Sequence, residues 1–254
     1  LLVSADRDVL EQQLAHHEPI YREVLTREHE VIMLLNKGKD MIARNNKSDS
    51  RSLQRDIDKI QQQWDKLRKE TVDRQTRLQT CMEHCRKYYR ALESFLPWLR
   101  QAEDKLDALK PSSFKRKHIE KQLKELQVFR NEVWKRSGEY ENTRSLGDTF
   151  HSACDIDKDI VKNELNNLKD RWDKLNNDLI ARTQALEDQS RKLSDFNENL
   201  RELQHGLERC EDKLASHDAL GGVARDPKLL DRVKSLRDEV GKLKKPHQGV
   251  RQQA

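Results

Sequence analysis

The chain has 254 residues, a length that fits one or two ordinary domains. Hydrophobic residues make up 34% of it and charged residues 37%, whereas ordinary globular domains contain about 45–50% and about 25%. This composition excludes a thick hydrophobic core and favours helices that each bury one narrow apolar stripe. The net charge is only +5, with 50 Lys and Arg interspersed among 45 Asp and Glu. A nucleic-acid partner is therefore not expected, since it calls for a concentrated basic stripe.

Polar and turn-forming runs divide the chain into predicted helices. The breaks are ARNNKSDS at 43–50, KPSS at 110–113, FHSACDID at 150–157, and LGG at 220–222 followed by DP at 226–227. The helices predicted between them cover 6–43, 50–109, 114–150, 155–217 and 226–245. The sequence starts with LLVSAD and no Met, which predicts a piece of a longer protein. No signal peptide is recognisable, and no apolar run approaches the roughly 18 residues of a membrane helix.

Apolar residues recur every three or four positions from Leu53 onward, the spacing of helices that supercoil left-handedly. No Gly or Pro occurs between Ser52 and Leu96, so one helix is expected to run far beyond the usual length. Pro97 is expected to bend that helix or to mark a helix start, because proline cannot donate a backbone hydrogen bond. The seam positions include Ile57, Ile60, Trp64, Leu67 and Thr71 early in the chain, and Leu200, Leu203 and Leu207 late in it.

Two tetrapeptides occur twice at one spacing. WDKL stands at 64–67 and 172–175, EDKL stands at 103–106 and 211–214, and both pairs are 108 residues apart. A fixed period of this size indicates an internal repeat. The predicted fold is therefore all-α: tandem three-helix, left-handed coiled-coil bundles in which long continuous helices are shared between neighbouring bundles.

These features resemble the spectrin repeat, whose period is about 106 residues and whose helix C continues into helix A of the next repeat. Trp64 in QQQWDKL and Trp172 in KDRWDKL match the helix C tryptophan, and Trp98 in SFLPWLRQAEDKL matches the helix A tryptophan. Within the family, FLPWLRQAEDKLDALKP resembles the rods of spectraplakins, the giant linkers of actin and microtubules. Spectrin, dystrophin and the nesprins are the competing subfamilies.

The resemblance implies a partial repeat with helices B and C at 1–80, a complete repeat at 81–187, and a partial repeat with helices A and B at 188–254. Partial repeats leave apolar stripes uncovered, so the two ends are expected to pack on another copy of the chain or to be poorly ordered. Gly206 stands where Trp98 stands in the earlier copy. A glycine there removes a large anchor and costs about 1 kcal/mol of helix stability relative to alanine.

Trp64, Trp98 and Trp172 are interpreted as structural core, because tryptophans at heptad spacing are far more often core than ligand box. Trp134 has no Trp counterpart in the first copy and is a slightly better candidate for an exposed contact, although core is still favoured. The chain has four cysteines, Cys81, Cys85, Cys154 and Cys210, interpreted as small buried or half-buried residues of a reducing compartment. No metal site is expected at Cys81, Cys85 and the neighbouring His84, which supply no fourth zinc ligand, or at the adjacent His16 and His17.

The most basic stretch is FKRKHIEKQLK at 114–124, called here the basic segment. Its cations are a candidate partner contact for actin, for the acidic surface of tubulin or for an anionic membrane, against the alternative of a solvated helix face. They are Lys115, Arg116, Lys117, Lys121 and Lys124.

No catalytic motif, P-loop, HExxH or dinucleotide fingerprint occurs, so no catalytic residue and no cofactor are expected. The favoured function is a structural rod or spacer in a large linker that connects actin and microtubules, placed in the cytoplasm and on the cytoskeleton. The alternatives are a docking module that uses the basic segment and, ranked low, a membrane-binding helical bundle. The expected partners are cytoskeletal or scaffold proteins, with possible self-association through the incomplete ends.

Overall fold

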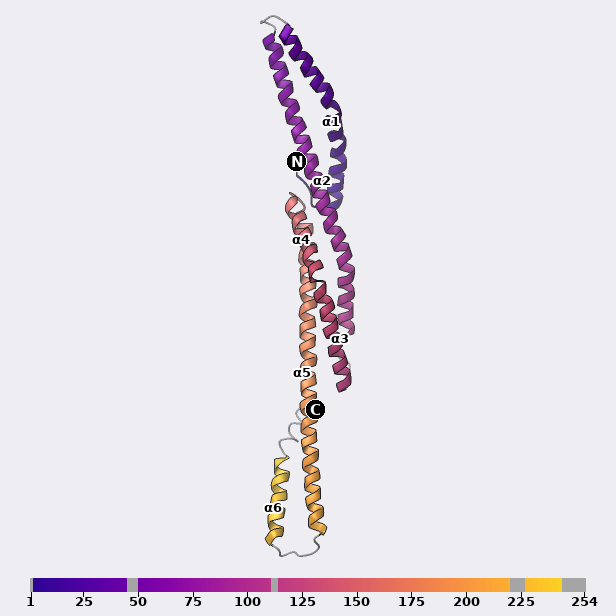
Figure 1. Ribbon diagram of the computed structural model, residues 1–254, viewed down its shortest axis with the longest axis vertical. Coiled ribbons are helices and arrows are strands. Elements are labelled where there is room, and N and C mark those ends of the chain that lie inside the picture. Colours follow the sequence, from indigo (N-terminus) through magenta and orange to yellow (C-terminus); the bar gives the residue numbers. More distant parts are fainter. Residues whose placement is uncertain (1, 45–49, 111–113, 220–226, 244–254) are drawn as a thin grey trace. The chain divides into compact units, whose positions relative to one another are not determined.

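The computed structural model describes residues 2–44, 50–110, 114–219 and 227–243, and these form an all-α fold, as predicted. The described residues also contain one isolated parallel β-bridge, between Ser4 and Ile156. The helices are α1 (Arg7–Arg44), α2 (Ser50–Ala108), α3 (Arg116–Lys135), α4 (Ser137–Ala153), α5 (Lys158–Ala219) and α6 (Pro227–Lys242) (Figure 1).

The predicted helix at 114–150 is wrong in one respect, because it is divided at Arg136 into α3 and α4. Ser137 and Gly138 follow the division, and Ser–Gly pairs are common causes of breaks in long helices. The expectation that Pro97 marks a helix start is also wrong. Pro97 lies inside α2, which is 59 residues long and continues on both sides of it.

The chain divides into two compact units, each described by itself. Unit 1 comprises 1–102 and 135–174, and unit 2 comprises 103–134 and 175–254. The long helices α2 and α5 each contribute residues to both units. The break between α4 and α5 falls in unit 1, where Asp157 has a positive φ of 58°, a conformation that aspartate tolerates better than most residues.

The core of unit 1 is built where α2, α4 and α5 meet. Heptad spacing along each helix turns one stripe of side chains inward, so each helix buries about one residue in three or four. The largest fully buried side chains of this core are Leu78, Met82, Tyr88, Phe95 and Leu99 from α2, Phe150 from α4, and Leu168 from α5.

Helix α1 forms an antiparallel hairpin with the first part of α2, also in unit 1 (Figure 1). Leu10, Val24 and Leu35 are its buried apolar residues. Between them, His17 Nδ1 lies 2.8 Å from Gln75 Oε1 of α2, and both side chains are buried. A hydrogen-bonded polar pair inside an apolar seam fixes the register of two helices, since any slip leaves both groups unsatisfied.

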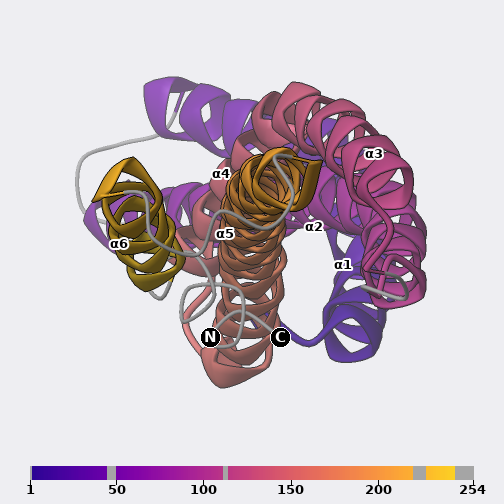
Figure 2. The ribbon, with the colours of Figure 1, turned by 90° about the horizontal axis from the view of Figure 1, so that it is seen from below.

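Unit 2 is built on the second part of α5. Its buried core includes Ile119, Leu126, Phe129 and Val133 of α3 and Leu175, Leu179 and Leu186 of α5. Arg182 of α5 donates to the carbonyl oxygen of Leu106, one of the last carbonyls of α2. Helix α6 lies beside the C-terminal part of α5 (Figures 1 and 2).

Candidate functional site

Four aromatic residues, Phe95, Trp98, Tyr140 and Trp172, form one cluster in unit 1, called here the aromatic layer. The rings of Tyr140 and Trp172 stack, with centroids 4.7 Å apart and planes at 10°. The Phe95 centroid lies 5.9 Å from that of Trp172. Helices α2, α4 and α5 each contribute to the layer, so it ties all three together.

The tryptophans of the aromatic layer differ in burial. Trp172 is 9% exposed, whereas Trp98 is half-buried at the edge, with its centroid 6.3 Å from that of Trp172. The guanidinium carbon of Arg136 lies 5.1 Å from the Trp98 ring centroid, a cation–π contact. The guanidinium group of Arg136, the residue between α3 and α4, therefore covers the exposed edge of the aromatic layer.

The two WDKL tetrapeptides have different surroundings. In the second copy Trp172 belongs to the aromatic layer and Leu175 is 2% exposed. In the first copy Trp64 is half-buried and Leu67 is 48% exposed. A contact of this part of α2 with another helix is the ion pair of Arg68 with Glu28 of α1, at 2.6 Å. The same sequence is covered in the three-helix region and half-covered in the hairpin.

The seam predicted from sequence is thus wrong at three positions. Ile60 is 40% exposed, Leu67 is 48% exposed and Leu207 is 49% exposed. Heptad spacing identifies the positions able to face a partner helix, but burial also requires that helix to be present. Ile60 and Leu67 lie in the stretch of α2 that contacts α1 through Arg68 and Glu28, and Leu207 follows Gly206, beside which Leu243 lies.

Trp134 corrects another expectation, since it is 75% exposed and lies outside the core. Its neighbour Val133 is fully buried and takes the inward position on α3, in phase with Leu126 and Phe129. Adjacent helical residues point about 100° apart, so Trp134 faces outward. The sequence signal was available, because the phase of α3 is set by residues 119–133.

The basic segment begins at the N-terminus of α3, and all five of its candidate cations are exposed. Two of them are already paired within the helix. Arg116 lies 3.1 Å from Glu120, and Lys121 lies 3.9 Å from Glu125. Lys117 and Lys124 are seven residues apart, about two helical turns, and therefore share one face.

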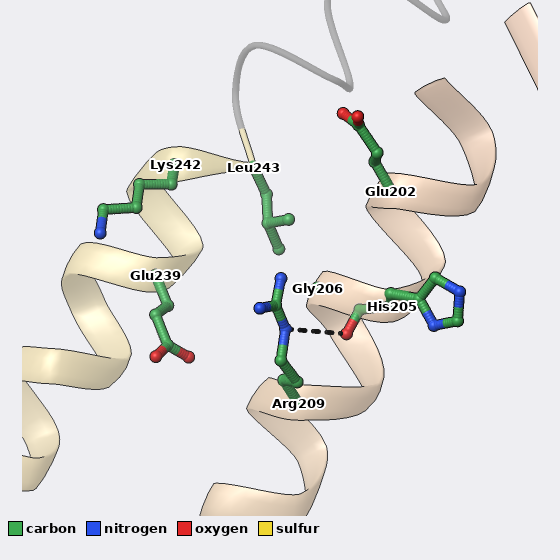
Figure 3. Close-up of a pocket in the computed structure, with 7 residues that line it drawn as sticks. All are labelled: Glu202, His205, Gly206, Arg209, Glu239, Lys242 and Leu243. Atoms are coloured by element: carbon green, nitrogen blue, oxygen red, sulfur yellow. Dashed lines mark hydrogen bonds between the residues drawn. The ribbon is translucent and has the colours of Figure 1, made fainter. Parts of the chain in front are cut away.

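A groove of about 450 Å³ lies between α5 and α6 in unit 2 (Figure 3). Its lining residues are Glu202, His205, Gly206, Arg209, Glu239, Lys242 and Leu243. Arg209 donates from Nε to the backbone oxygen of His205 at 3.4 Å, and Glu239 pairs with Lys213. The charged lining groups carry both signs, which gives the groove no single preference for an anion or a cation.

Gly206 explains how α6 approaches α5 at this groove. A Cβ added at Gly206 would collide with the side chain of Leu243, which occupies the space beside the glycine. The position that carries Trp98 in the earlier copy therefore remains a packing position. Here the large apolar group is Leu243, the residue that follows α6, and not a side chain of α5 itself.

Two tyrosines and a carboxylate form a polar group in unit 1 that sequence reasoning missed. Tyr89 Oη donates to Glu164 at 2.9 Å and Tyr88 Oη donates to it at 3.3 Å. Burial raises the pKa of Tyr88, and the adjacent Glu164 charge adds to the effect. Burial likewise raises the pKa of Tyr89. Both phenols are therefore held as neutral donors.

The described ranges contain no candidate metal site and no candidate membrane span. There, no group of three or more His, Cys, Asp and Glu side chains could hold a metal ion, and Cys81, His84 and Cys85 are no exception. His16 is exposed while His17 is engaged with Gln75. Of the helices described, none is long and apolar enough to cross a membrane.

Comparison with known proteins agrees with this architecture. Residues 83–188 match the model of the spectrin repeat family. The chain is 26% identical over 243 residues to microtubule-actin cross-linking factor 1 of Rattus norvegicus, covering 94% of this chain and 4% of that protein. It is 26% identical over 248 residues to the human protein of that name, isoforms 1/2/3/4/5, covering 96% of this chain and 3% of the relative. No solved structure matches the chain.

The matched span contains the aromatic layer, from Phe95 to Trp172, together with all of α4 and the parts of α2 and α5 that carry the layer. The spectrin-repeat family and these linker relatives are structural proteins, and the chain spans only a few per cent of each relative's length, 4% in the rat protein. Residues 83–188 therefore match a spectrin repeat, and the chain as a whole is similar to the microtubule-actin cross-linking factors.

Proposed function

We propose that the chain is a rod or spacer segment of a large cytoskeletal linker that connects actin and microtubules, that it acts in the cytoplasm on the cytoskeleton, and that it is not an enzyme. The names of its relatives support the linker assignment. The observation that carries the spacer role is the continuity of α2 and α5, of 59 and 62 residues, each of which belongs to both compact units. Tension applied along the chain is then transmitted through covalent helix as well as through packing.

The repeat boundaries predicted from sequence remain part of this proposal: a partial repeat at 1–80, a complete one at 81–187, and a partial one at 188–254. The contrast between Trp172 and Trp64 supports them. A Trp that is 9% exposed in the central region and half-buried in the hairpin is what a complete and a partial bundle produce.

Single-molecule pulling tests the spacer proposal. Each bundle is held by one narrow stripe of buried side chains, so local opening requires little free energy compared with a thick core. We expect stepwise unfolding at modest force, with the central repeat opening last. A chain that resists extension until one all-or-none rupture at high force contradicts the proposal.

Docking through the basic segment is the second candidate, supported by the exposure of Lys117 and Lys124 on one face. Co-sedimentation with actin filaments and, separately, with microtubules across a salt series distinguishes the two. Docking predicts pelleting that fades as salt rises and that is lost in Lys117→Glu/Lys124→Glu. The matched control is Lys162→Glu/Lys169→Glu, two exposed lysines with the same spacing on α5. Absence of pelleting at low salt favours the spacer alone.

A further inference from the structure

Three of the four cysteines gather in unit 1 around the end of α4. Cys81 and Cys85 lie one turn apart on α2, and Cys154 follows the last residue of α4. Their exposed fractions are 1%, 0% and 4%. All are free thiols, as is Cys210 in unit 2.

Cys81 and Cys154 are held against each other by contacts on either side of them. The Cys81 thiol donates to the carbonyl oxygen of Ala153, the residue before Cys154, at 3.3 Å. One turn earlier on α2, Arg77 Nη2 lies 2.5 Å from Asp155 Oδ1. Cys154 itself has an extended backbone, φ −96° and ψ 160°, which takes its side chain off the helix and toward α2.

Residues 3–5 also hydrogen-bond to the connection between α4 and α5. The Val3 amide donates to Asp155 Oδ2 at 2.8 Å, and the Asp155 amide donates to the Val3 carbonyl at 2.8 Å. The Ala5 amide donates to the Ile156 carbonyl at 2.9 Å. The α4–α5 connection is therefore hydrogen-bonded both to α2 and to residues 3–5. Cys81 and Cys154 lie close to these hydrogen bonds in the sequence.

The three thiols of the cluster differ in reactivity. The hydrogen bond from Cys154, aided by the Arg77 charge, lowers the pKa of Cys81 to about 7. The same hydrogen bond, together with burial, raises the pKa of Cys154. Burial raises the pKa of Cys85 to about 11. Because the thiolate is the nucleophile, the lowered pKa favours Cys81 over Cys85 as the attacking thiol.

We propose that Cys81 and Cys154 are a redox-sensitive pair that hydrogen peroxide converts into a disulfide joining α2 to the α4–α5 connection. The Cys81 thiolate attacks one peroxide oxygen, the O–O bond breaks, and the departing hydroxide takes up a proton to become water. The Cys154 sulfur then attacks the sulfur of the Cys81 sulfenic acid. The hydroxide displaced from that sulfur takes the Cys154 proton and leaves as a second water. Two sulfurs together lose two electrons, and the peroxide gains them.

The disulfide goes beyond the spacer role and does not depend on it. It joins two segments that are 73 residues apart in sequence, across the point where α4 ends and the N-terminal residues attach. Oxidation closes this point covalently, while reduction leaves it held by hydrogen bonds and the Arg77–Asp155 ion pair. The proposed consequence is a unit 1 whose resistance to opening depends on the thiol redox state.

Peptide mapping of the folded, fully reduced chain tests the pair directly. The protein is exposed to graded hydrogen peroxide while circular dichroism confirms constant helix content, then alkylated, digested and analysed by mass spectrometry. We expect a Cys81–Cys154 cross-linked peptide that disappears on treatment with dithiothreitol. Recovery of both residues as free thiols at every concentration that preserves helix content overturns the proposal, and so does a Cys81–Cys85 cross-link.

Two variants separate the pair from its neighbours. Cys85→Ala removes the third thiol of the cluster and is expected to keep the cross-link. Cys154→Ala removes the resolving thiol, and Cys81 should then accumulate as a sulfenic acid that a dimedone probe labels. Equal dimedone labelling of Cys81 in the unaltered chain and in Cys154→Ala overturns the proposal, because it means that Cys154 does not resolve the oxidised Cys81.

Discussion

Lys105 of α2 lies with its Nζ 2.9 Å from Glu132 Oε2 of α3 and 4.7 Å from the ring centroid of Phe129. Lys213, which stands 108 residues later in the second EDKL, pairs with Glu239 of α6. Both pairs belong to unit 2. In both copies of EDKL, the lysine therefore pairs with a carboxylate of the next helix in the chain. The repeated sequence makes the same kind of interhelical contact twice.

A double-mutant cycle on Lys105→Met and Glu132→Gln should give a small coupling energy. Both side chains are about half exposed, at 48% and 52%, so solvent screens the pair and we expect about 0.5 kcal/mol or less at physiological salt. Lys105→Met alone should cost somewhat more than Glu132→Gln, because it also removes the contact with Phe129. Urea unfolding at low and high salt measures both terms. A coupling above about 2 kcal/mol would contradict the argument.

Trp172→Ala and Trp64→Ala compare one residue of the repeat in two surroundings. Trp172 stacks on Tyr140 and is 9% exposed, so its loss should cost about 3–5 kcal/mol of unfolding free energy. Trp64 is half-buried in the hairpin and should cost clearly less. Urea denaturation followed by circular dichroism gives both values. Equal costs would mean that the two WDKL copies are packed alike.

The helices and their periodicity could be predicted from the sequence because heptad spacing and breakers are local. The long helix α2 illustrates this, because its length was predicted from the spacing and only the helix start expected at Pro97 was wrong. Its position on the exposed side of α2 lets the helix continue around it, with one backbone donor lost. The division at Arg136 was missed because Ser137 and Gly138 weaken a helix without requiring it to end.

Burial and long-range contacts could not be predicted in the same way. Whether Leu67 or Leu175 is covered depends on a third helix, and the two tetrapeptides are identical. The pairing of residues 3–5 with 155–156 joins segments with no shared pattern. The meeting of Cys81 with Cys154 likewise depends on where α4 ends, and a single-residue change in that end would separate them.

Gly147→Ala should destabilise unit 1 even though alanine favours helix. A Cβ at Gly147 would lie 2.5 Å from Leu165 Cδ2 and 2.7 Å from Tyr88 Cε1, and Tyr88 is fully buried. Overpacking of this kind typically costs about 1–3 kcal/mol, against a helix gain of about 1 kcal/mol. Gly138→Ala in the same helix is the matched control, since nothing lies within 4 Å of its added Cβ. The midpoint temperature of thermal unfolding should be higher for Gly138→Ala than for the unaltered chain, and lower for Gly147→Ala.

Acid should release the N-terminal residues from the α4–α5 connection. The Arg77 hydrogen bond, followed by that from the Val3 amide, lowers the pKa of Asp155 below its ordinary 3.8. A depressed folded-state pKa means that this carboxylate stabilises the fold fully above the ordinary value, and that the contribution is lost as pH falls through the folded value. Amide hydrogen exchange at Ala5 and Ile156, measured from pH 6 downward by pulse labelling, should report the release. Asp155→Asn should show fast exchange already at neutral pH.

The exposed apolar residues of the α1–α2 hairpin predict self-association of the chain. Leu34, Ile60 and Leu67 are 59%, 40% and 48% exposed, and the α5–α6 hairpin exposes Leu214 and Val240 in the same way. Covering the uncovered apolar stripe of a helix with another helix stabilises the assembly by about 25 cal/mol per Å² removed from water.

Analytical ultracentrifugation should therefore show a weight-average mass that rises with concentration, and Ile60→Lys/Leu67→Lys should reduce the rise. The control Lys66→Gln/Lys69→Gln changes exposed side chains of the same stretch of α2 and should leave the association in place. A monomer at all concentrations, with slow amide exchange in both hairpins, would show that two helices suffice and that the exposed stripes need no cover.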